Sequence, residues 1–412
     1  MDAFQLVENA PGVVFPQGFQ AAGAACDIRQ TGDTARLDLA VIYSELPCQS
    51  AGVFTRNAIF AAPVKACREL LRSGAPVHGI VANSGNANAC TGAQGWSDAV
   101  RMVGEAAAAL GLTTDSLYVA STGRIGRALP MDAVSKGIQS AVDGLSTTAE
   151  AGFAAADAIL TSDTRRKVAC AVIETPQGQV RVGGIAKGAG MIEPNMATML
   201  AFITTDARVP TSLLQGALHD GVALTFNAIT VDGDMSTNDT VLVLANGASG
   251  IAIDQNLLPA FKGALKAVCE QLARKIVGDG EKISKVVELR IVGAKNNEDA
   301  ERVARAIGNS LLVKSSWYGN DPNWGRLLDA AGYSGAAIRE EQLELFYRAS
   351  PEVEAAPVFL RGNAVHENLA QWKEIVRRKE FLIELNLHLG EGSARLWSTD
   401  LTEAYVHFNK SE

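Results

Sequence analysis

The chain has 412 residues, of which 47% are hydrophobic and 20% charged, and its formal net charge is −8 at pH 7. An acidic chain is a poor partner for nucleic acids and anionic membranes, because both bind basic surfaces. No segment approaches the ~18 apolar residues of a membrane span, and the first residues lack the features of a signal peptide, so we expect a cytoplasmic protein.

Cysteine and histidine give no sign of a disulfide framework or a metal site. The six cysteines are scattered and include no C-x-x-C pair, so buried free thiols are the expected state. The five histidines form no cluster with metal-ligand spacing, so no metal is predicted and all five are interpreted as structural.

The first half of the chain alternates short apolar runs with Ala-rich helical segments. Residues 37–43 read LDLAVIY and predict a buried strand. Residues 97–110 predict a helix that Ser97 caps and Gly111 ends. Another helix is expected after Pro130, where apolar residues recur at a spacing of four.

The second half carries the clearest periodic patterns. Residues 257–277 place apolar side chains at spacings of three and four, which predicts a long helix. Residues 287–291 and 383–389 alternate apolar and polar side chains and predict half-buried strands, with His388 on the solvated face of the second. A helix is expected over 297–307. Half-buried strands favour antiparallel pairing, so the fold class is α/β with mixed sheets and no long linker.

The most informative segment is 183–205, which reads GGIAKGAGMIEPNMATMLAFITT. Glycines are concentrated in 183–190 and predict a permissive, flexible backbone. The apolar run 199–203 predicts a buried strand. Thr198 therefore stands where a flexible segment meets a strand that starts inside the core.

This position suits an N-terminal nucleophile. The hydroxyl of Thr198 could attack the carbonyl of Ala197, and hydrolysis of the resulting ester would give Thr198 a free α-amine. Such an amine has an unperturbed pKa of about 7.7–8.0, so it can act as general base for its own hydroxyl. The alternative from the pattern alone is that this glycine-rich segment is a loop before a strand and that the loop contacts a phosphate. However, the glycines do not have the spacing of the known phosphate-binding motifs.

The segment KGAGMIEPNMATML closely resembles the self-cleavage motif of the ornithine acetyltransferases, the ArgJ family of arginine biosynthesis, and the family's cleavage site maps to Ala197 and Thr198. Further segments resemble the family in the same order: GVFTRNAIFAAPV at 52–64, VANSGNANACTG at 81–92, ASTGRIG at 120–126, ILTSDT at 159–164, ITVDGDMSTNDT at 229–240, DGE at 279–281 and GNDPNWGR at 319–326. The resemblance therefore covers nearly the whole chain.

The resemblance implies an activity and an architecture. It implies an N-terminal-nucleophile-like fold of the ArgJ/DmpA type, with mixed, largely antiparallel sheets layered with helices. An α chain of 1–197 and a β chain of 198–412 would stay associated as α2β2. The enzyme would need no cofactor and would move acetyl from N2-acetyl-L-ornithine to L-glutamate through an acetyl-threonyl intermediate. Some family members also accept acetyl-CoA, and the residues leave that choice open.

The resemblance also assigns roles to residues before the cleavage site. Thr122 and Gly123 match the oxyanion-hole pair, whereas the pattern alone would make them an ordinary S-T-G turn. Lys187 matches a substrate contact, plausible as a point charge for a carboxylate, and its alternative is a solvated loop lysine. Thr161 matches another substrate position, and its alternative is a turn threonine.

Beyond the cleavage site, the chain matches the family less closely. Glu281 matches a substrate glutamate that would hold the ammonium of ornithine, but the unusual Lys282 follows it. Asn409 matches a C-terminal substrate residue, with a frayed tail as the alternative. Ser411 is two residues further on, where the family has Thr or Ser five residues on. Arg124 replaces the family's small aliphatic residue.

Two other functions stay open from the sequence. A self-processing N-terminal-Thr amidase or aminopeptidase would use the same nucleophile, base and oxyanion hole, and would differ in admitting water to the acyl-enzyme. A non-catalytic relative would fit the departures from the family pattern, and its chain would stay uncut.

Overall fold

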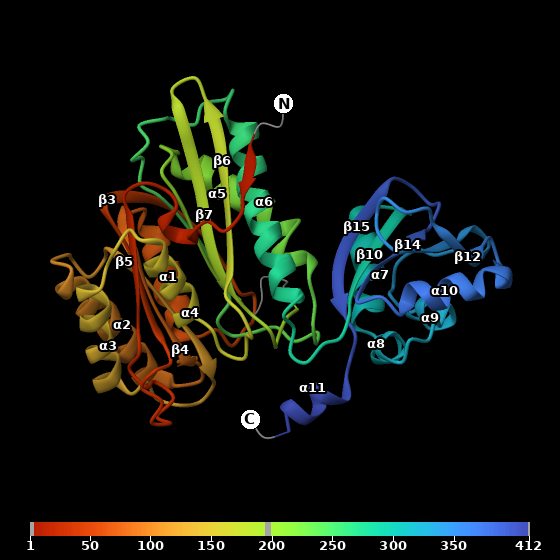
Figure 1. Ribbon diagram of the computed structural model, residues 1–412, viewed down its shortest axis with the longest axis horizontal. Helices are drawn as coiled ribbons and strands as arrows, with labels where there is room; N and C mark the ends of the chain where they lie inside the picture. Colours follow the sequence, from red (N-terminus) through yellow and green to blue (C-terminus); the bar gives the residue numbers. More distant parts are fainter. Residues whose placement is uncertain (1–3, 194–198, 411–412) are drawn as a thin grey trace. The chain divides into compact units, whose positions relative to one another are not determined.

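The computed structural model describes residues 4–193 and 199–410, and within them no helix is long and apolar enough to cross a membrane. The chain forms two compact units (Figure 1). The first contains Met1–Asn227 and Asp234–Ile276, and the second contains Ala228–Gly233 and Val277–Glu412. The compact units therefore do not divide at 197/198, and strands from both sides of that point lie in the first unit.

A single sheet organises the first unit. Its described strands follow one another in the order β1 (Gln5–Val7), β6 (Lys167–Thr175), β7 (Gly178–Lys187), β8 (Leu200–Thr205), β9 (Thr240–Ala245), β3 (Leu39–Phe54), β4 (Val77–Asn86) and β5 (Leu117–Arg124), and β2 (Phe19–Ala24) pairs with β3. The pairs β8–β9 and β4–β5 are parallel and the other described pairs are antiparallel. The expected mixed, largely antiparallel sheet is confirmed.

Strand β3 connects the two parts of this sheet. Its first part pairs with β2 and β4, and its second part pairs with β9. The strand expected at 37–43 is the beginning of this longer one, which continues to Phe54. A register shift between Tyr43 and Cys48 lets the chain leave one set of partners and join the other.

Helices pack on the sheet of the first unit: α1 (Ala62–Ser73), α2 (Gly92–Ala109), α3 (Met131–Asp143), α4 (Ala149–Ala158), α5 (Thr211–Ala223) and α6 (Leu258–Val277). Short 3-10 turns form at η1 (Gly12–Val14) and η2 (Phe226–Ala228). Apolar side chains of α2, α3 and α4 share one core with β2 to β5. The helices expected after Pro130 and over 257–277 are confirmed as α3 and α6.

The expected start of α2 is wrong. The helix begins at Gly92 rather than at Ser97, and the side chain of Thr91 makes no capping hydrogen bond. The side chain of Asn88 donates to the carbonyl of Gly95 at 2.8 Å. This contact ties the first turn of the helix to the preceding segment, which the local capping pattern does not reveal.

The expectation of a flexible loop at 183–190 is also corrected. Gly183 and Gly184 lie in the extended strand β7. A Cβ on Gly183 would lie 2.0 Å from the carbonyl oxygen of Gly12. A Cβ on Gly184 would instead meet Leu272 of α6 at 3.1 Å. The two glycines face opposite sides of the strand, and close approach of other elements explains them better than flexibility does.

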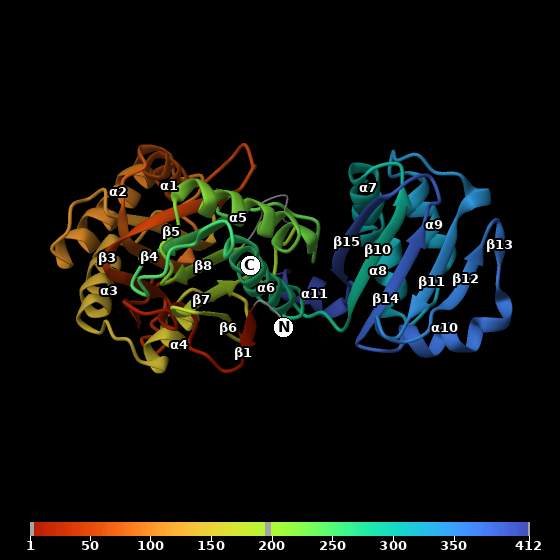
Figure 2. The ribbon, with the colours of Figure 1, turned by 90° about the horizontal axis from the view of Figure 1, so that it is seen from above.

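The second unit is a sheet covered by helices (Figure 2). Its described strands run in the order β13 (Asn363–Ala364), β12 (Ala356–Leu360), β11 (Glu344–Arg348), β14 (Glu380–Asn386), β10 (Val286–Ala294) and β15 (Gly392–Thr399). Its helices are α7 (Asn297–Asn309), α8 (Leu311–Tyr318), α9 (Trp324–Gly332), α10 (Leu369–Val376) and α11 (Glu403–Phe408), with 3-10 turns η3 (Glu340–Gln342) and η4 (His366–Asn368). Among the described strands of the second unit, only β10 and β14 pair in parallel.

Most periodic patterns of the second unit are confirmed, with one exception. The strand at 287–291 and the helix at 297–307 appear as β10 and α7. The strand expected to reach 389 ends at Asn386, so His388 does not lie on a strand. The side chain of Asn386 accepts the His388 N–H at 3.0 Å, and His388 adopts φ +49°. The strand therefore stops although the apolar alternation continues.

All six cysteines are free, as expected. Their expected burial is only partly correct. Cys90 is exposed and Cys26 is partly buried, and the buried thiols are Cys48, Cys67, Cys170 and Cys269.

Candidate active site

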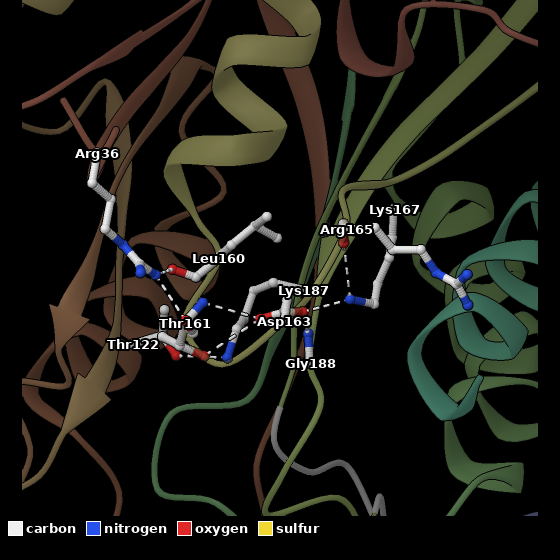
Figure 3. A network of polar contacts seen from close by, with 9 residues as sticks. All are labelled: Arg36, Thr122, Leu160, Thr161, Asp163, Arg165, Lys167, Lys187 and Gly188. Atoms are coloured by element: carbon white, nitrogen blue, oxygen red, sulfur yellow. Dashed lines mark hydrogen bonds and ion pairs between the residues drawn. The ribbon is translucent and has the colours of Figure 1, made fainter. Parts of the chain in front are cut away.

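Two strand ends bring together residues that are 65 positions apart in the sequence. Thr122 and Gly123 lie near the end of β5, and Lys187 is the last residue of β7. The ammonium of Lys187 donates to the Thr122 hydroxyl at 3.2 Å (Figure 3). Lys187 is 3% exposed and Thr122 is 7% exposed. The alternative of a solvated loop lysine is therefore excluded.

Gly123 occupies a backbone position that suits glycine. It adopts φ +132° and pairs in register with Gly85 of β4. Gly123 is exposed, unlike Thr122 before it. Arg124, which departs from the family pattern, is also exposed, and its carbonyl accepts the N–H of Ala87 at 2.9 Å.

Asp163 is the centre of the polar network beside Lys187, and sequence reasoning missed it. One carboxylate oxygen accepts from Lys167 at 2.6 Å and from the Gly188 N–H at 2.7 Å. The other oxygen accepts the Thr161 N–H at 3.0 Å. The side chains of Asp163 and Lys167 are fully buried. The motif TSDT contains Asp163, and an acid in a motif otherwise valued for Thr161 was the available signal.

The charge of Asp163 is maintained by two lysines. Burial by itself would raise the pKa of this carboxyl group, but the positive charges of Lys187 and Lys167 and the donated hydrogen bonds hold the pKa well below its ordinary value. Asp163 is therefore ionised at neutral pH, and it attracts Lys187 as well as Lys167.

Thr161 belongs to the same network mainly through its backbone. Its carbonyl accepts from Arg36 at 2.7 Å and from Arg29 at 3.2 Å. Its hydroxyl lies 3.5 Å from the Asp163 carboxylate, which is the long limit of a hydrogen bond. Thr161 as a whole is partly buried.

A second buried acid holds the beginning of the strand after the proposed cleavage site. Ala197 and Thr198 lie outside the described residues, and Met199 is the first described residue after them. The N–H of Met199 donates to Asp239 at 2.7 Å. Burial raises the pKa of Asp239 well above its ordinary value, against the opposing effects of this N–H and of Lys187.

Asn238, beside Asp239, connects the same segment to β5. Its side-chain amide donates to the carbonyl of Ser121 at 2.8 Å and to that of Ala87 at 2.6 Å. Ser121 directly precedes Thr122, so Asn238 helps to fix the end of β5. The motif ITVDGDMSTNDT includes both residues, but its sequence did not indicate which side chains mattered.

The second unit brings two expected substrate residues together. The side-chain amide of Asn409, just after α11, donates to the Glu281 carboxylate at 3.1 Å. The ammonium of Lys282 lies over the ring of Phe408, 5.0 Å from its centre. The hydroxyl of Thr402 caps α11 and also donates to the carbonyl of Lys282 at 2.7 Å. The described end of the chain is thus tied to the Glu281 segment, whereas Ser411 lies outside the described residues.

The described residues include groups that an acyl-transfer site could use. Thr122 offers a hydroxyl and Gly123 a backbone N–H where β5 ends, and the ionised pair at Asp163 lies behind them. Such donors stabilise the negative oxygen of a tetrahedral intermediate. In the described part of the chain, no cluster of three or more His, Cys, Asp or Glu could hold a metal ion.

Comparison with known proteins gives consistent matches over nearly the whole chain. The profile of the ArgJ family matches residues 20–411. The arginine biosynthesis bifunctional protein ArgJ of Symbiobacterium thermophilum is 46% identical over 408 residues, covering 98% of each chain. The glutamate N-acetyltransferase of Methanosarcina mazei is 43% identical, covering 95% of this chain and 98% of its own. A solved ornithine acetyltransferase from Mycobacterium tuberculosis, in complex with ornithine, is 38% identical with a TM-score of 0.43, covering 47% of this chain and 98% of its own.

Proposed function

This chain belongs to the ArgJ family, and we propose that it is a cytoplasmic acyltransferase of arginine biosynthesis that moves acetyl from N2-acetyl-L-ornithine to L-glutamate. In this proposal the chain first cuts itself between Ala197 and Thr198, and the freed Thr198 is the nucleophile. The names of the relatives support the pathway and the glutamate acceptor, since they are an arginine biosynthesis protein and a glutamate N-acetyltransferase.

The observation that carries the proposal is the meeting of β5 and β7 beside the strand that follows the cleavage site. Lys187 reaches the hydroxyl of Thr122, and in the sheet Lys187 pairs with Leu200 of β8. Leu200 is only two residues after Thr198. Lys187 therefore links Thr122 to the beginning of β8, which supports a role for Thr122 close to the proposed nucleophile.

The proposed reaction has two halves. The Thr198 hydroxyl attacks the acetyl carbonyl, and its α-amine takes the hydroxyl proton and passes it to the leaving nitrogen of ornithine. The acetyl ester then waits for the amine of L-glutamate, which attacks it, and the proton returns to the threonine oxygen as N-acetylglutamate leaves. Each half passes through an oxyanion held by Thr122 and Gly123, and each donor is worth about 2.7–4 kcal/mol.

The substrate side of the proposal follows the family resemblance residue by residue. We propose substrate contacts for Thr161 and, separately, for Glu281, Asn409 and Ser411. The Glu281 side chain is a suitable partner for the side-chain ammonium of ornithine, and the amide of Asn409 donates to its carboxylate. Acetyl-CoA is a second donor to be tested with the same assay.

The sheet explains how the two chains would stay together after cleavage. Strand β8 begins at Leu200 and is hydrogen-bonded to β7 on one side and to β9 on the other. Strand β9 in turn pairs with β3. Residues 198–412 therefore place two neighbouring strands inside a sheet whose other described strands come from 1–197. We propose that the resulting pair of chains assembles further as α2β2.

Intact-mass measurement tests the proposal directly. The purified protein should give two chains split at Ala197–Thr198, and N2-acetylornithine should add one acetyl group to the C-terminal chain. L-glutamate should then remove that acetyl group and yield N-acetylglutamate. The matched control is Thr198→Ala, which should stay uncut.

Other outcomes of the same experiment contradict the proposal in distinct ways. Loss of the acetyl group at the same rate with and without glutamate would indicate an amidase or aminopeptidase. Cleavage without acetylation would assign another acyl donor. A single uncut chain in the unaltered protein would remove Thr198 as the nucleophile and favour a non-catalytic relative.

A further inference from the structure

We propose that Lys187 and Asp163 are positioning residues of the oxyanion hole: Lys187 fixes the rotation of the Thr122 hydroxyl, and Asp163 fixes Lys187. This inference rests on the proposed acyl-transfer function. It gives Lys187 a different task from the substrate-carboxylate contact that the family resemblance implies, and it assigns a task to Asp163, which the sequence analysis did not single out.

The first step follows from the donor inventory of the two side chains. A lysine ammonium has three N–H donors and no acceptor. The Thr122 oxygen, 3.2 Å from the Lys187 ammonium, must therefore be the acceptor in this contact. The single O–H proton of Thr122 is then directed away from Lys187 and is available to an oxyanion. Without Lys187, the hydroxyl could rotate and offer its lone pairs instead.

Burial makes this orientation effective. Lys187 and Thr122 are both buried, so water competes little with their contact. A preorganised donor costs no reorganisation when the oxyanion forms, which is the main source of its catalytic value. A hydroxyl that first had to turn would lose part of this advantage.

The second step concerns what holds Lys187 in place. Asp163 accepts the N–H of Gly188, the residue directly after Lys187, at 2.7 Å. This bond fixes the backbone at the end of β7. The ionised carboxylate also attracts the Lys187 ammonium itself. Asp163 therefore holds the backbone next to Lys187 and attracts the ammonium at the end of its side chain.

The charges of the cluster also suit an oxyanion. Lys187 and Lys167 face the ionised Asp163, and Lys187 also lies close enough to the buried Asp239 for their charges to interact. Burial strongly disfavours ionisation of Asp239. The positive charge of Lys187 beside Thr122 favours a developing negative oxygen.

The test separates positioning from substrate binding by using two acyl donors. N2-acetylornithine carries a carboxylate, whereas 4-nitrophenyl acetate has neither a carboxylate nor an amine. If Lys187 acts through Thr122, Lys187→Met should slow acetylation of the enzyme by about 100-fold with both donors. The KM for N2-acetylornithine should stay close to its original value. A loss confined to N2-acetylornithine and expressed as a higher KM would overturn the proposal in favour of a carboxylate contact.

A double-mutant cycle tests whether Lys187 acts through Thr122. Thr122→Val removes the hydroxyl, so adding Lys187→Met to it should cause little further loss. If the rate losses of the two single variants multiply in the double variant, Lys187 and Thr122 act independently and the proposal is overturned. Asp163→Asn should lower the acetylation rate with both donors in the same way as Lys187→Met, and it gives a second route if Lys187→Met folds poorly. Equal rates in Asp163→Asn and the unaltered protein would remove Asp163 from the proposal.

Controls keep this inference distinct from the proposed function. Lys136, an exposed lysine of α3, provides a matched variant, Lys136→Met, with no expected effect. If the unaltered protein is acetylated by neither donor, the proposed function fails. If the unaltered protein is acetylated and Lys187→Met matches it with both donors, only the positioning role fails.

Discussion

A single methyl group at Gly123 tests the geometry of the oxyanion site. A Cβ built at this position would lie 2.3 Å from the carbonyl carbon of Gly85 and 2.5 Å from the nitrogen of Asn86. Ordinary contacts of a Cβ begin near 3.4 Å. Because the surroundings are close-packed backbone, Gly123→Ala requires β4 and β5 to separate locally by about 1 Å.

The expected effect follows from that displacement. A misplacement of about 1 Å at a reacting centre costs about 100-fold in rate. The N–H of Gly123 moves with its own backbone, so the oxyanion loses a well-aimed donor. An unfavourable backbone conformation adds about 1–3 kcal/mol of strain, because φ +132° suits glycine and few other residues. We therefore expect Gly123→Ala to lower kcat by about 100-fold or more.

Gly126 provides the matched control three residues along the chain. It also has a positive φ, +80°, but a Cβ there meets nothing within 4 Å. Gly126→Ala therefore carries backbone strain without the collision. The assay is the kcat of acetyl transfer to glutamate, with the thermal midpoint of each variant measured alongside. A folded Gly123→Ala with the kcat of Gly126→Ala would refute the reasoning from close approach.

Further predictions concern the buried acids. Lys167→Met breaks a fully buried ion pair with Asp163, so the free energy of unfolding should fall by about 3–5 kcal/mol. Denaturant titration measures this change, and a decrease of less than about 1 kcal/mol would contradict the prediction. The pKa of Asp163 is lowered from 3.8, so its stabilising effect is complete above pH 3.8 and is lost as the pH falls below it. Below pH 3.8, the melting midpoint of Asp163→Asn should therefore depend less on pH than that of the unaltered protein. An equal dependence on pH in the two proteins would contradict this prediction. The pKa of Asp239 is raised, so the folded state loses stability relative to the unfolded chain as the pH rises above 3.8. Melting midpoints of Asp239→Asn should not show this loss. The same dependence of the melting midpoint on pH in Asp239→Asn and in the unaltered protein would contradict the prediction.

The sequence by itself determined the features that depend on local periodicity and on long motifs. The helix α6 is readable because its apolar side chains recur every three or four residues and most of them are buried. Strand β10 is readable because apolar and charged residues alternate. The motif around Thr198 and the segment containing Thr122 and Gly123 also identified the family, because such long matches rarely arise by chance.

Local periodicity was misleading at element boundaries and at close approaches. Side-chain hydrogen bonds of Asn88 and Asn386 accompany the start of α2 and the end of β14. Gly183 and Gly184 resembled a flexible loop, although each is a glycine because another element packs against β7. In all three cases the periodicity of the segment does not contain the information about which groups the segment contacts in the folded chain.

Only the tertiary structure decided how the site is built. Lys187 carries no mark of burial in the sequence, and it is buried because β7 ends beside β5 and the ionised Asp163 offsets the cost of removing its charge from water. The importance of Asp163 follows from its hydrogen bonds with Lys167, Gly188 and Thr161, not from its place in a motif. A buried charge needs partners in three dimensions, and those partners come from loops and strands that only the folded sheet brings together.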